Sequence, residues 1–182
     1  MGHPVPNTLV KVIGIDDLNG EHMGPNQTGE LLVKGPQVMK GYYNRPEETE
    51  KSFMDGWFRT GDLVRYNEDG MFYIADRIKE LIKVKGFQVP PAELEELIRD
   101  FPGVNEAAVV GVPDEYSGEV PRAFVVPKSG HTINKGELLE HVHSKVAKYK
   151  RLHGGVFVVD SIPKTTSGKI LRRQLKLQNL SN

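Results

Sequence analysis

ADRIKELIKVKGFQVPPAELE, residues 75–95, is the stretch in which the pattern of the sequence changes. Before it, short β-prone runs alternate with turn signals. At its end two consecutive prolines favour the start of a helix, and the apolar positions 94, 97 and 98 share one helical face. No linker rich in Ser or Pro separates the two patterns. The boundary between two parts of the chain is therefore tight, and we place it near Lys79.

Residues 1–78 are expected to form a short all-β subdomain. Gly, Asn and Asp mark the turns between its apolar runs, and Glu68-Asp-Gly70 is a strong turn signal. One brief helix is indicated where a proline precedes several acidic residues, which suit the positive end of a helix dipole. The expected strands are residues 9–15, 30–33, 64–66 and 71–74, and the expected helix is 46–50.

Residues 79–182 are expected to form a small α+β domain, so the whole chain is of the α+β class. Helical periodicity and short apolar runs alternate here, without an internal repeat. Ser167 is a favourable helix cap, which predicts that the last helix begins there. The expected helices are residues 92–98, 137–146 and 167–177, and the expected strands are 107–112, 123–126 and 156–159.

Composition limits the classes of protein that fit. The 182 residues include no cysteine, so disulfides, thiolate metal sites and a cysteine nucleophile are excluded. No apolar run approaches the roughly 20 residues that span a bilayer, which predicts an intracellular protein without a transmembrane segment. The net charge is zero, yet the last forty residues carry nine Lys or Arg against the single Asp160. This basic end indicates either an anionic partner or a solvated helix face.

Asp62 and Arg77 are candidate nucleotide-binding residues. Thr60-Gly61-Asp62 is expected at a strand end, and the two oxygens of an ionised Asp match the paired hydroxyls of a ribose. Fifteen residues later, Arg77 adds a guanidinium for the same sugar or a phosphate. The alternatives are an ordinary Asp turn and a surface ion pair.

Three lysines, Lys79, Lys83 and Lys85, alternate with apolar residues, so in a strand they share one face. Gly86 permits a tight turn that brings the backbone and the ammonium of Lys85 together against a phosphate. The alternative is an edge strand that its lysines protect from aggregation.

The segment IPKTTSGKILRR, residues 162–173, presents Lys169 directly after a Ser-Gly turn. It is not a nucleotide P-loop, because Pro163 replaces the first Gly and Ile170 replaces the magnesium-binding Ser or Thr. The basic tail lacks the interleaved aromatic residues of a nucleic-acid module. His141 and His143 point to different faces of a predicted helix, so we expect surface residues and no metal site. Lys169 is thus expected to meet a small phosphate or carboxylate group.

The chain resembles the adenylate-forming enzymes, in particular the acyl-CoA synthetases that include 4-coumarate:CoA ligases and firefly luciferases. Its motifs occur in the order of that family over nearly the full length. The hinge position holds Lys79, as in the 4-coumarate ligase and luciferase branch, rather than the Asp of acetyl-CoA synthetases. The motifs are residues 29–35, 41–49, WFRTGDL (57–63), residues 75–95 and IPKTTSGKILR (162–172).

The resemblance implies a reaction in two steps. A carboxylate attacks the α-phosphate of ATP to give an acyl adenylate and pyrophosphate, and the thiol of CoA then displaces AMP. Lys169 would lie between the carboxylate and the α-phosphate, and Lys79 would be the pivot between the domains. The nucleotide-binding residues would be Asp62, Arg77, Thr60, Gly61, Lys83 and Gln88, and the CoA-binding residues would be Lys85 and Gly86.

The family's Ser/Thr/Gly-rich phosphate loop and its Tyr-Gly-x-Thr-Glu motif are absent from this sequence. The resemblance therefore implies the C-terminal end of the AMP-binding domain (1–78) followed by a mobile lid (79–182). Mg²⁺ would be bound mostly by the missing N-terminal domain, and the chain alone is expected to be inactive. The alternative is a stand-alone module that binds a nucleotide, CoA or a protein. The expected compartment is the cytoplasm; the end Leu180-Ser-Asn182 lacks the Ser-Lys-Leu signal of the peroxisome.

Overall fold

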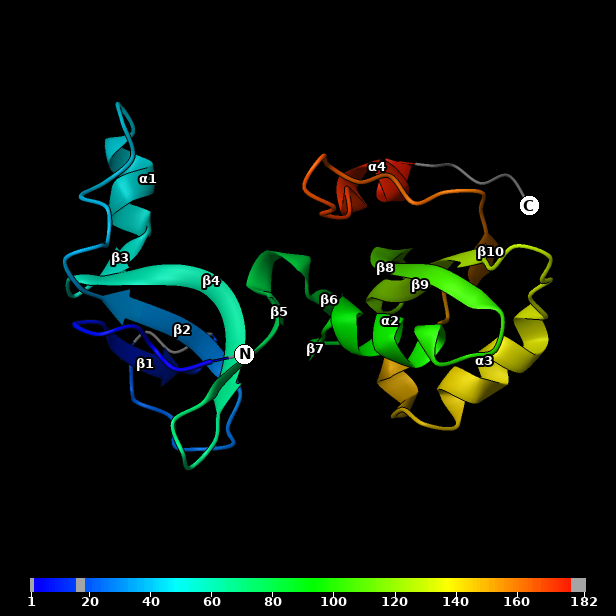
Figure 1. Cartoon of the computed structure of the whole chain (residues 1–182), viewed down its shortest axis with the longest axis horizontal. Coiled ribbons are helices and arrows are strands. Elements are labelled where there is room, and N and C mark those ends of the chain that lie inside the picture. Colours follow the sequence, from blue (N-terminus) through cyan, green and yellow to red (C-terminus); the bar gives the residue numbers. More distant parts are fainter. Residues whose placement is uncertain (1, 16–18, 178–182) are drawn as a thin grey trace. The chain divides into compact units, whose positions relative to one another are not determined.

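The computed structural model describes residues 2–15 and 19–177. Residues 180–182, on which the compartment prediction rests, lie outside them. The chain forms two compact units, Met1–Lys79 and Glu80–Asn182. Between the described ends of the chain, no helix is both long and apolar enough to cross a membrane. Each unit is built around its own five-stranded sheet (Figure 1).

The N-terminal unit is an antiparallel sheet with one short helix, which agrees with the expected all-β pattern. Its strands follow the order β1-β2-β4-β3, and β5 pairs with β4. The helix α1 begins with a proline and carries two acidic residues in its first turn, as its sequence predicts. The elements are β1 (Leu9–Ile13), β2 (Gly29–Lys34), α1 (Pro46–Lys51), β3 (Phe53–Met54), β4 (Trp57–Tyr66) and β5 (Phe72–Arg77).

Two irregularities shape β4. Glu30 pairs with Leu63 and Leu32 with Arg59, so residues 60–62 of β4 lie opposite Leu31 alone. Such extra residues form a bulge that bends the strand and turns its side chains away from the regular ladder. A second shift in register, between Leu63 and Val64, interrupts the pairing of β4 with β5. The motif Thr60-Gly61-Asp62 therefore lies inside a ten-residue strand, and the prediction that it ends a strand is wrong.

The C-terminal unit is a mixed α+β structure. Its sheet follows the order β10-β9-β6-β7, with β8 on β9, and only β10 runs parallel to its neighbour β9 among the described strands. A 3-10 turn, η1 (Ile78–Glu80), precedes the regular elements, and a second one, η2 (Lys148–Lys150), lies among them. These are β6 (Ile82–Val84), β7 (Phe87–Val89), α2 (Pro91–Arg99), β8 (Val104–Asp114), β9 (Gly118–Pro127), α3 (Lys135–His143), β10 (Val156–Val158) and α4 (Arg172–Leu177).

Both faces of the β8–β9 hairpin are covered. In Figure 1, α2 and α3 lie on one side of β8 and β9, and α4 lies on the other. Residues 107–112 are accordingly buried without alternation, because neither side of the strand faces water. One core joins Leu94 and Ile98 of α2 to the sheet, and the other places Leu175 of α4 against Phe124.

Three expectations for the C-terminal unit need correction. The last helix begins at Arg172 and not at Ser167, because Gly168 adopts a left-handed φ of 82° and the preceding residues form a turn. The helix expected at 137–146 runs from Lys135 to His143. The cationic strand is only three residues long, since Lys79 lies in η1 and Lys85 has a φ of 50°.

Candidate functional site

The nucleotide-binding candidates of the N-terminal unit meet at the β4 bulge. Asp62 and Arg77 pair in register across β4 and β5, and Arg77 Nε lies 2.8 Å from Asp62 Oδ1. Arg77 Nη1 also donates to the carbonyl of Thr60 at 3.1 Å. One guanidinium thus holds both ends of the motif. The ion pair is made through Oδ1 of Asp62, whose side chain is 19% exposed.

Thr60 and Gly61 fix the shape of this motif. The hydroxyl of Thr60 donates to the carbonyl of Leu31 at 2.8 Å and accepts from the N–H of Asp62 at 3.0 Å. Gly61 has a φ of 68°, a conformation that strains any residue with a Cβ. A Cβ there would meet nothing within 4 Å, so the requirement for glycine comes from the backbone and not from crowding. The bulge is therefore stabilised by one hydrogen bond within β4 and by one to β2.

A half-buried ion pair supports the same region. Glu30 is only 3% exposed, and both Nε and Nη2 of Arg59 donate to its Oε2. The hydrogen bonds and the charge of Glu30 raise the pKa of Arg59 against the effect of burial. Since Glu30 and Arg59 bracket the bulge on opposite strands, this pair fixes the register there.

The lysine-rich segment forms a tight hairpin. Lys85 and Gly86 both have positive φ and connect β6 to β7, which is the geometry of a two-residue hairpin turn. Lys83 pairs in register with Gln88, and its backbone N–H donates to Glu119. Lys83, Lys85, Gly86 and Gln88 are thus brought together on one hairpin.

The partners of Lys85 differ from the expected ones. Its backbone N–H donates to the carbonyl of Ser117 at 2.9 Å, and its ammonium lies 3.9 Å from the centre of the Tyr116 ring. The backbone N–H of Lys85 thus has a partner within the protein, while a contact between its exposed ammonium and a phosphate stays a prediction. Gly86 remains exposed at the tip of the turn.

Lys169 stands on a self-contained loop. Gly168 donates to the carbonyl of Thr165 at 2.9 Å, and the backbone N–H of Lys169 donates to the Thr165 hydroxyl at 3.1 Å. The N–H of Thr165 donates back to the carbonyl of Lys169 at 2.8 Å. The backbone at Lys169 is therefore fixed, while its side chain is 65% exposed. The expected loop lysine is present, on a closed turn rather than in the first turn of a helix.

The sequence did not indicate the groups around the base of this loop. Arg172 Nε lies 2.6 Å from Glu80 Oε2, and Arg172 Nη1 lies 2.6 Å from Glu95 Oε1. The ammonium of Lys169 lies 3.9 Å from the other oxygen of Glu80. Burial lowers the pKa of Arg172, but the charges and hydrogen bonds of Glu95 and Glu80 outweigh it and raise the pKa overall. Glu95 and Glu80 lie 77 and 92 positions from Arg172 in the chain, beyond any local pattern.

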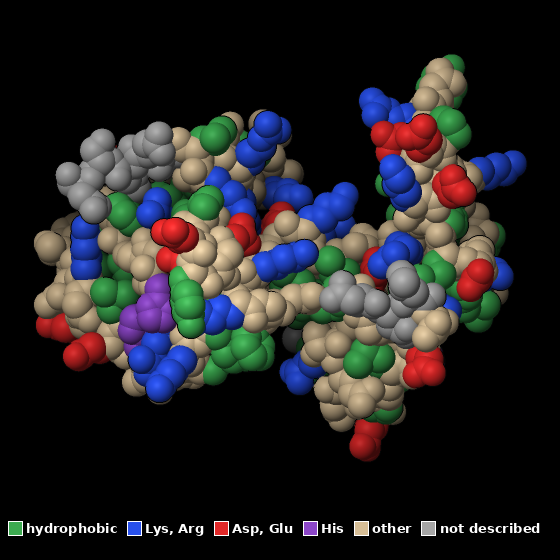
Figure 2. Space-filling view, turned by 180° about the vertical axis from the view of Figure 1, so that it is seen from behind, with side chains coloured by type: hydrophobic (Ala, Val, Ile, Leu, Met, Phe, Trp, Pro, Cys, Tyr) green, Lys and Arg blue, Asp and Glu red, His purple; other side chains and the backbone are tan. Residues whose placement is uncertain are grey.

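The histidines of α3 are not both simple surface residues. His143 Nε2 accepts a hydrogen bond from the backbone N–H of the buried Leu152 at 3.0 Å. Burial and the positive charges of Arg151 and His153 lower the pKa of His143. Figure 2 shows a group of His side chains on one face of the C-terminal unit. In the described part of the chain, no three His, Asp or Glu side chains gather in a way that could hold a metal ion.

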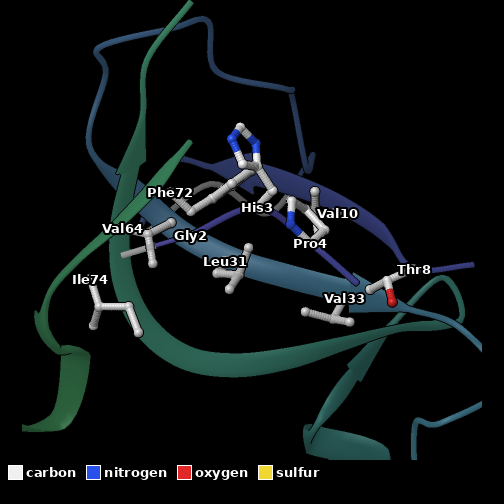
Figure 3. Close-up of a pocket in the computed structure, with 10 residues that line it drawn as sticks. All are labelled: Gly2, His3, Pro4, Thr8, Val10, Leu31, Val33, Val64, Phe72 and Ile74. Atoms are coloured by element: carbon white, nitrogen blue, oxygen red, sulfur yellow. The ribbon is translucent and has the colours of Figure 1, made fainter. Parts of the chain in front are cut away.

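A shallow apolar cavity of about 360 Å³ lies on the sheet of the N-terminal unit. Figure 3 shows side chains of β1, β2, β4 and β5 around it, together with the segment that carries His3 and Pro4. Among the described residues that line it, His3 is the only one with an acidic or basic side chain. The predicted site residues are not among its walls, so this cavity is separate from the residues predicted to bind the nucleotide and CoA.

Two family models match the chain. Residues 93–169 match the AMP-binding enzyme C-terminal domain, and residues 1–43 match the AMP-binding enzyme family. A probable 4-coumarate–CoA ligase 2 of Dictyostelium discoideum is 49% identical over 94% of this chain, which spans 31% of that protein. The chain thus spans about a third of the length of the curated relatives it matches.

Solved structures agree with these relatives. ATP-bound MatB from Rhodopseudomonas palustris matches 96% of this chain with a TM-score of 0.90 and 37% identity, over 34% of its own length. An o-succinylbenzoate CoA synthetase from Bacillus subtilis, in complex with its acyl-adenylate intermediate, matches 95% of this chain with a TM-score of 0.83 and 38% identity, over 34% of its own length. The chain therefore belongs to the AMP-binding, adenylate-forming enzymes and matches their C-terminal region.

Proposed function

We propose that this chain is the C-terminal part of an acid:CoA ligase. The complete enzyme would activate a carboxylic acid with ATP, forming an acyl adenylate and releasing pyrophosphate. The thiolate of CoA would then attack the acyl carbon, forming the thioester and releasing AMP. The relatives and solved structures are ligases and adenylate-forming enzymes, which supports this class of reaction.

The observation that carries the proposal is the loop of Lys169. Three hydrogen bonds between Thr165 and residues 168–169 fix the backbone of this loop. The ammonium of Lys169 is nevertheless exposed and lies 3.9 Å from Glu80 Oε1. An exposed pair at this distance is worth only about 0.2–1 kcal/mol, so a phosphate can displace it. A fixed cation directed at developing phosphate charge stabilises the transition state electrostatically. Lys169 would thus bridge the attacking carboxylate and the α-phosphate.

Asp62 and Arg77 would hold the nucleotide. Asp62 Oδ2 would accept from the ribose hydroxyls while Oδ1 stays with Arg77, and the bulge fixed by Thr60 and Gly61 would present it. A carboxylate that accepts from a hydroxyl forms a strong, charge-assisted hydrogen bond. Arg77 has a 55% exposed side chain and would add a donor for the sugar or a phosphate.

The hairpin of the C-terminal unit would serve the second step. Lys83 and Gln88 would approach the nucleotide, and Lys85 and Gly86 would approach CoA after a rotation at Lys79. The lid would comprise residues 79–182, and residues 1–78 would belong to the AMP-binding domain. The exposed Gly86, with a φ of 83° and open space at its Cβ position, permits close approach of a ligand to the backbone.

Mg²⁺ would accompany ATP in such a reaction. The described residues offer no cluster of carboxylates or histidines that fits a metal ion, so we assign it no ligand in this chain. That other parts of the enzyme bind it stays a prediction, as does the cytoplasmic compartment with the peroxisome as its alternative.

The test uses a complete ligase that contains this chain. With ATP, Mg²⁺ and a panel of carboxylic acids, it should exchange labelled pyrophosphate into ATP in an acid-dependent manner and form a thioester when CoA is added. Failure of every acid to support exchange would overturn the proposal. For the 182-residue chain alone, titration calorimetry with AMP and CoA tests the alternative. Micromolar binding without any pyrophosphate release would favour a stand-alone binding module.

A further inference from the structure

Arg172 joins three elements of the C-terminal unit at the base of the Lys169 loop. Its side chain is 15% exposed and contacts Glu80 of η1 and Glu95 of α2. Glu95, which is only 4% exposed, also accepts the backbone N–H of Val109 on β8 at 2.8 Å. Arg172 itself is the first residue of α4 and follows Lys169 by three positions. The contacts of its guanidinium therefore lie three residues along the chain from Lys169.

The pair of Arg172 and Glu95 links two layers that lie on opposite sides of the sheet. The helices α2 and α4 cover different faces of β8 and β9 (Figure 1). Among the described strands β8 pairs only with β9, so β8 is an edge of this sheet. The contact between Arg172 and Glu95 therefore links α4 to α2 beside the edge strand β8.

Negative charge exceeds positive charge among the three side chains Arg172, Glu80 and Glu95. Arg172 carries one positive charge against the two carboxylates of Glu80 and Glu95. Glu95 has further partners in Val109 N–H and in a second nitrogen of Arg172 at 3.4 Å. Glu80 shares one oxygen with Arg172 and leaves the other, Oε1, facing the ammonium of Lys169 at 3.9 Å. The excess negative charge thus lies on the side from which Lys169 extends.

We propose that Arg172 is a positioning residue for Lys169. By binding Glu80 and Glu95 together, it would fix where the loop leaves the domain, and through Glu80 it would present a weak counter-ion that keeps Lys169 extended until a phosphate replaces it. This inference rests on the proposed role of Lys169 in adenylation. Lysine cannot replace arginine here, because a single ammonium lacks the planar fork that reaches two carboxylates at once.

The first test compares half-reactions in a complete ligase that contains this chain. Arg172→Gln should slow acyl adenylate formation by roughly tenfold to a hundredfold, because a misplacement of about 1 Å costs on that order. The conversion of supplied acyl adenylate to thioester should stay within about twofold of normal. Arg172→Lys should give an intermediate loss of the first step. Arg173→Gln is the matched control, because it removes the same charge from the exposed neighbouring residue.

The second test measures amide hydrogen exchange in the 182-residue chain. Arg172→Gln should speed exchange at Lys169 and Thr165, whose N–H groups close the loop, by about tenfold or more. Exchange at the buried Val125 of β9 should change much less, since it reports on global opening of the domain. Equal acceleration at all three amides would show that Arg172 only stabilises the fold, and would overturn the proposal. If Arg172→Gln does not fold, the same three exchange rates are measured in Arg172→Lys and compared with those of the unchanged chain.

The outcomes separate this inference from the proposed function. If Lys169→Ala leaves adenylation intact, the proposed function of Lys169 fails. If Lys169→Ala abolishes adenylation while neither Arg172 variant slows it, only the positioning role fails. Equal losses in both half-reactions for Arg172→Lys would also contradict positioning, because the second step does not require Lys169 near the α-phosphate.

Discussion

Asp62 and Arg77 face each other across β4 and β5, and one oxygen of the Asp62 carboxylate lies 2.8 Å from Arg77 Nε. The two residues are separated by fifteen positions and pair in register beside the bulge at residues 60–62 of β4. The ion pair is made through Oδ1 of Asp62, and the proposed nucleotide contact is assigned to its second oxygen.

The first prediction concerns that second oxygen. In the complete ligase, Asp62→Asn should raise the Kd for ATP by about tenfold to a hundredfold, because hydrogen bonds to a charged group contribute about 1.5–3 kcal/mol. The rate at saturating ATP should fall much less. Equilibrium dialysis with labelled ATP measures the affinity. Glu68→Gln, which removes one charge from an exposed residue of the same unit, should leave it unchanged. Equal weakening by both variants would mean that only the overall charge matters.

The second prediction compares two glycines of the N-terminal unit. Gly61→Ala should lower the free energy of unfolding by about 1–2 kcal/mol, because only its positive φ opposes a side chain. Gly29→Ala should cost more, since a Cβ there would lie 2.1 Å from the carbonyl oxygen of Ile13 and the strands would have to separate. Urea unfolding of the 182-residue chain gives both values. If Gly61→Ala lowers the free energy of unfolding more than Gly29→Ala does, the positive φ at Gly61 outweighs the close contacts at Gly29, and the prediction is wrong.

The third prediction is a loss of stability in mild acid. The pKa of His143 is lowered in the fold, so the unfolded chain takes up its proton first as the pH falls. The contribution of neutral His143 is complete above the unfolded pKa of about 6.5 and decreases as the pH falls from there toward the lower folded pKa. Urea midpoints of the chain between about pH 8 and pH 5 should show this decrease.

Two variants identify the group responsible. His143→Gln removes the titrating ring and should flatten the pH dependence between about pH 6.5 and pH 5. His131→Gln removes an exposed histidine and should leave the dependence as it is. An unchanged slope in His143→Gln would assign the effect to other groups. The lowered pKa of Asp114 affects a more acidic range, because the ordinary value for Asp is about 4.

The sequence predicted the class of fold because local signals agreed with the final structure. Proline at the start of α1 and α2, the apolar face of α2 and the buried run of β8 all carry their information within a few residues. The end of the chain was harder, since Ser167 suits a helix cap equally well as a turn. The left-handed Gly168 and the hydroxyl of Thr165 close a loop there instead.

The candidate site was predictable in its residue types but not in its supporting contacts. Thr60, Asp62 and Arg77 come together as a motif suggests, but the bulge depends on the pairing of β4 with β2, a strand about thirty residues earlier. The contacts of Arg172 with Glu80 and Glu95 join positions that no periodicity relates. Such long-range ion pairs depend on how the layers of the domain pack, which a single sequence does not display.

The fourth prediction concerns Lys169 in the complete ligase. Lys169→Ala should slow acyl adenylate formation by about two to three powers of ten, since removing one electrostatic donor from a transition state costs about 2.7–4 kcal/mol. Thioester formation from supplied acyl adenylate should stay near normal. Rapid quench of each half-reaction makes the comparison. Lys164→Ala, which removes an ion pair with Glu106 at the other end of the loop, serves as the control. Equal losses in both steps would assign Lys169 to folding or general binding.

The last prediction concerns the hinge proposed at Lys79. This exposed residue lies in the middle of η1, and the next residue, Glu80, is bound to Arg172 within the C-terminal unit. Because that contact fixes Glu80 to its own domain, a rotation between the units would have to be absorbed at or just before Lys79. Proline at this position fixes φ near about −65° and removes a backbone N–H.

In the complete ligase, Lys79→Pro should therefore still form acyl adenylate and pyrophosphate but pass little of the adenylate to CoA. Rapid quench should show adenylate that accumulates on the enzyme, whereas Lys79→Ala, which leaves the backbone free to rotate, should complete both steps. Normal thioester formation by Lys79→Pro would refute the hinge at this residue. Loss of both steps together with a lower Tm would show damage to the fold, and proline at Ile78 would then test the neighbouring torsion in the same assay.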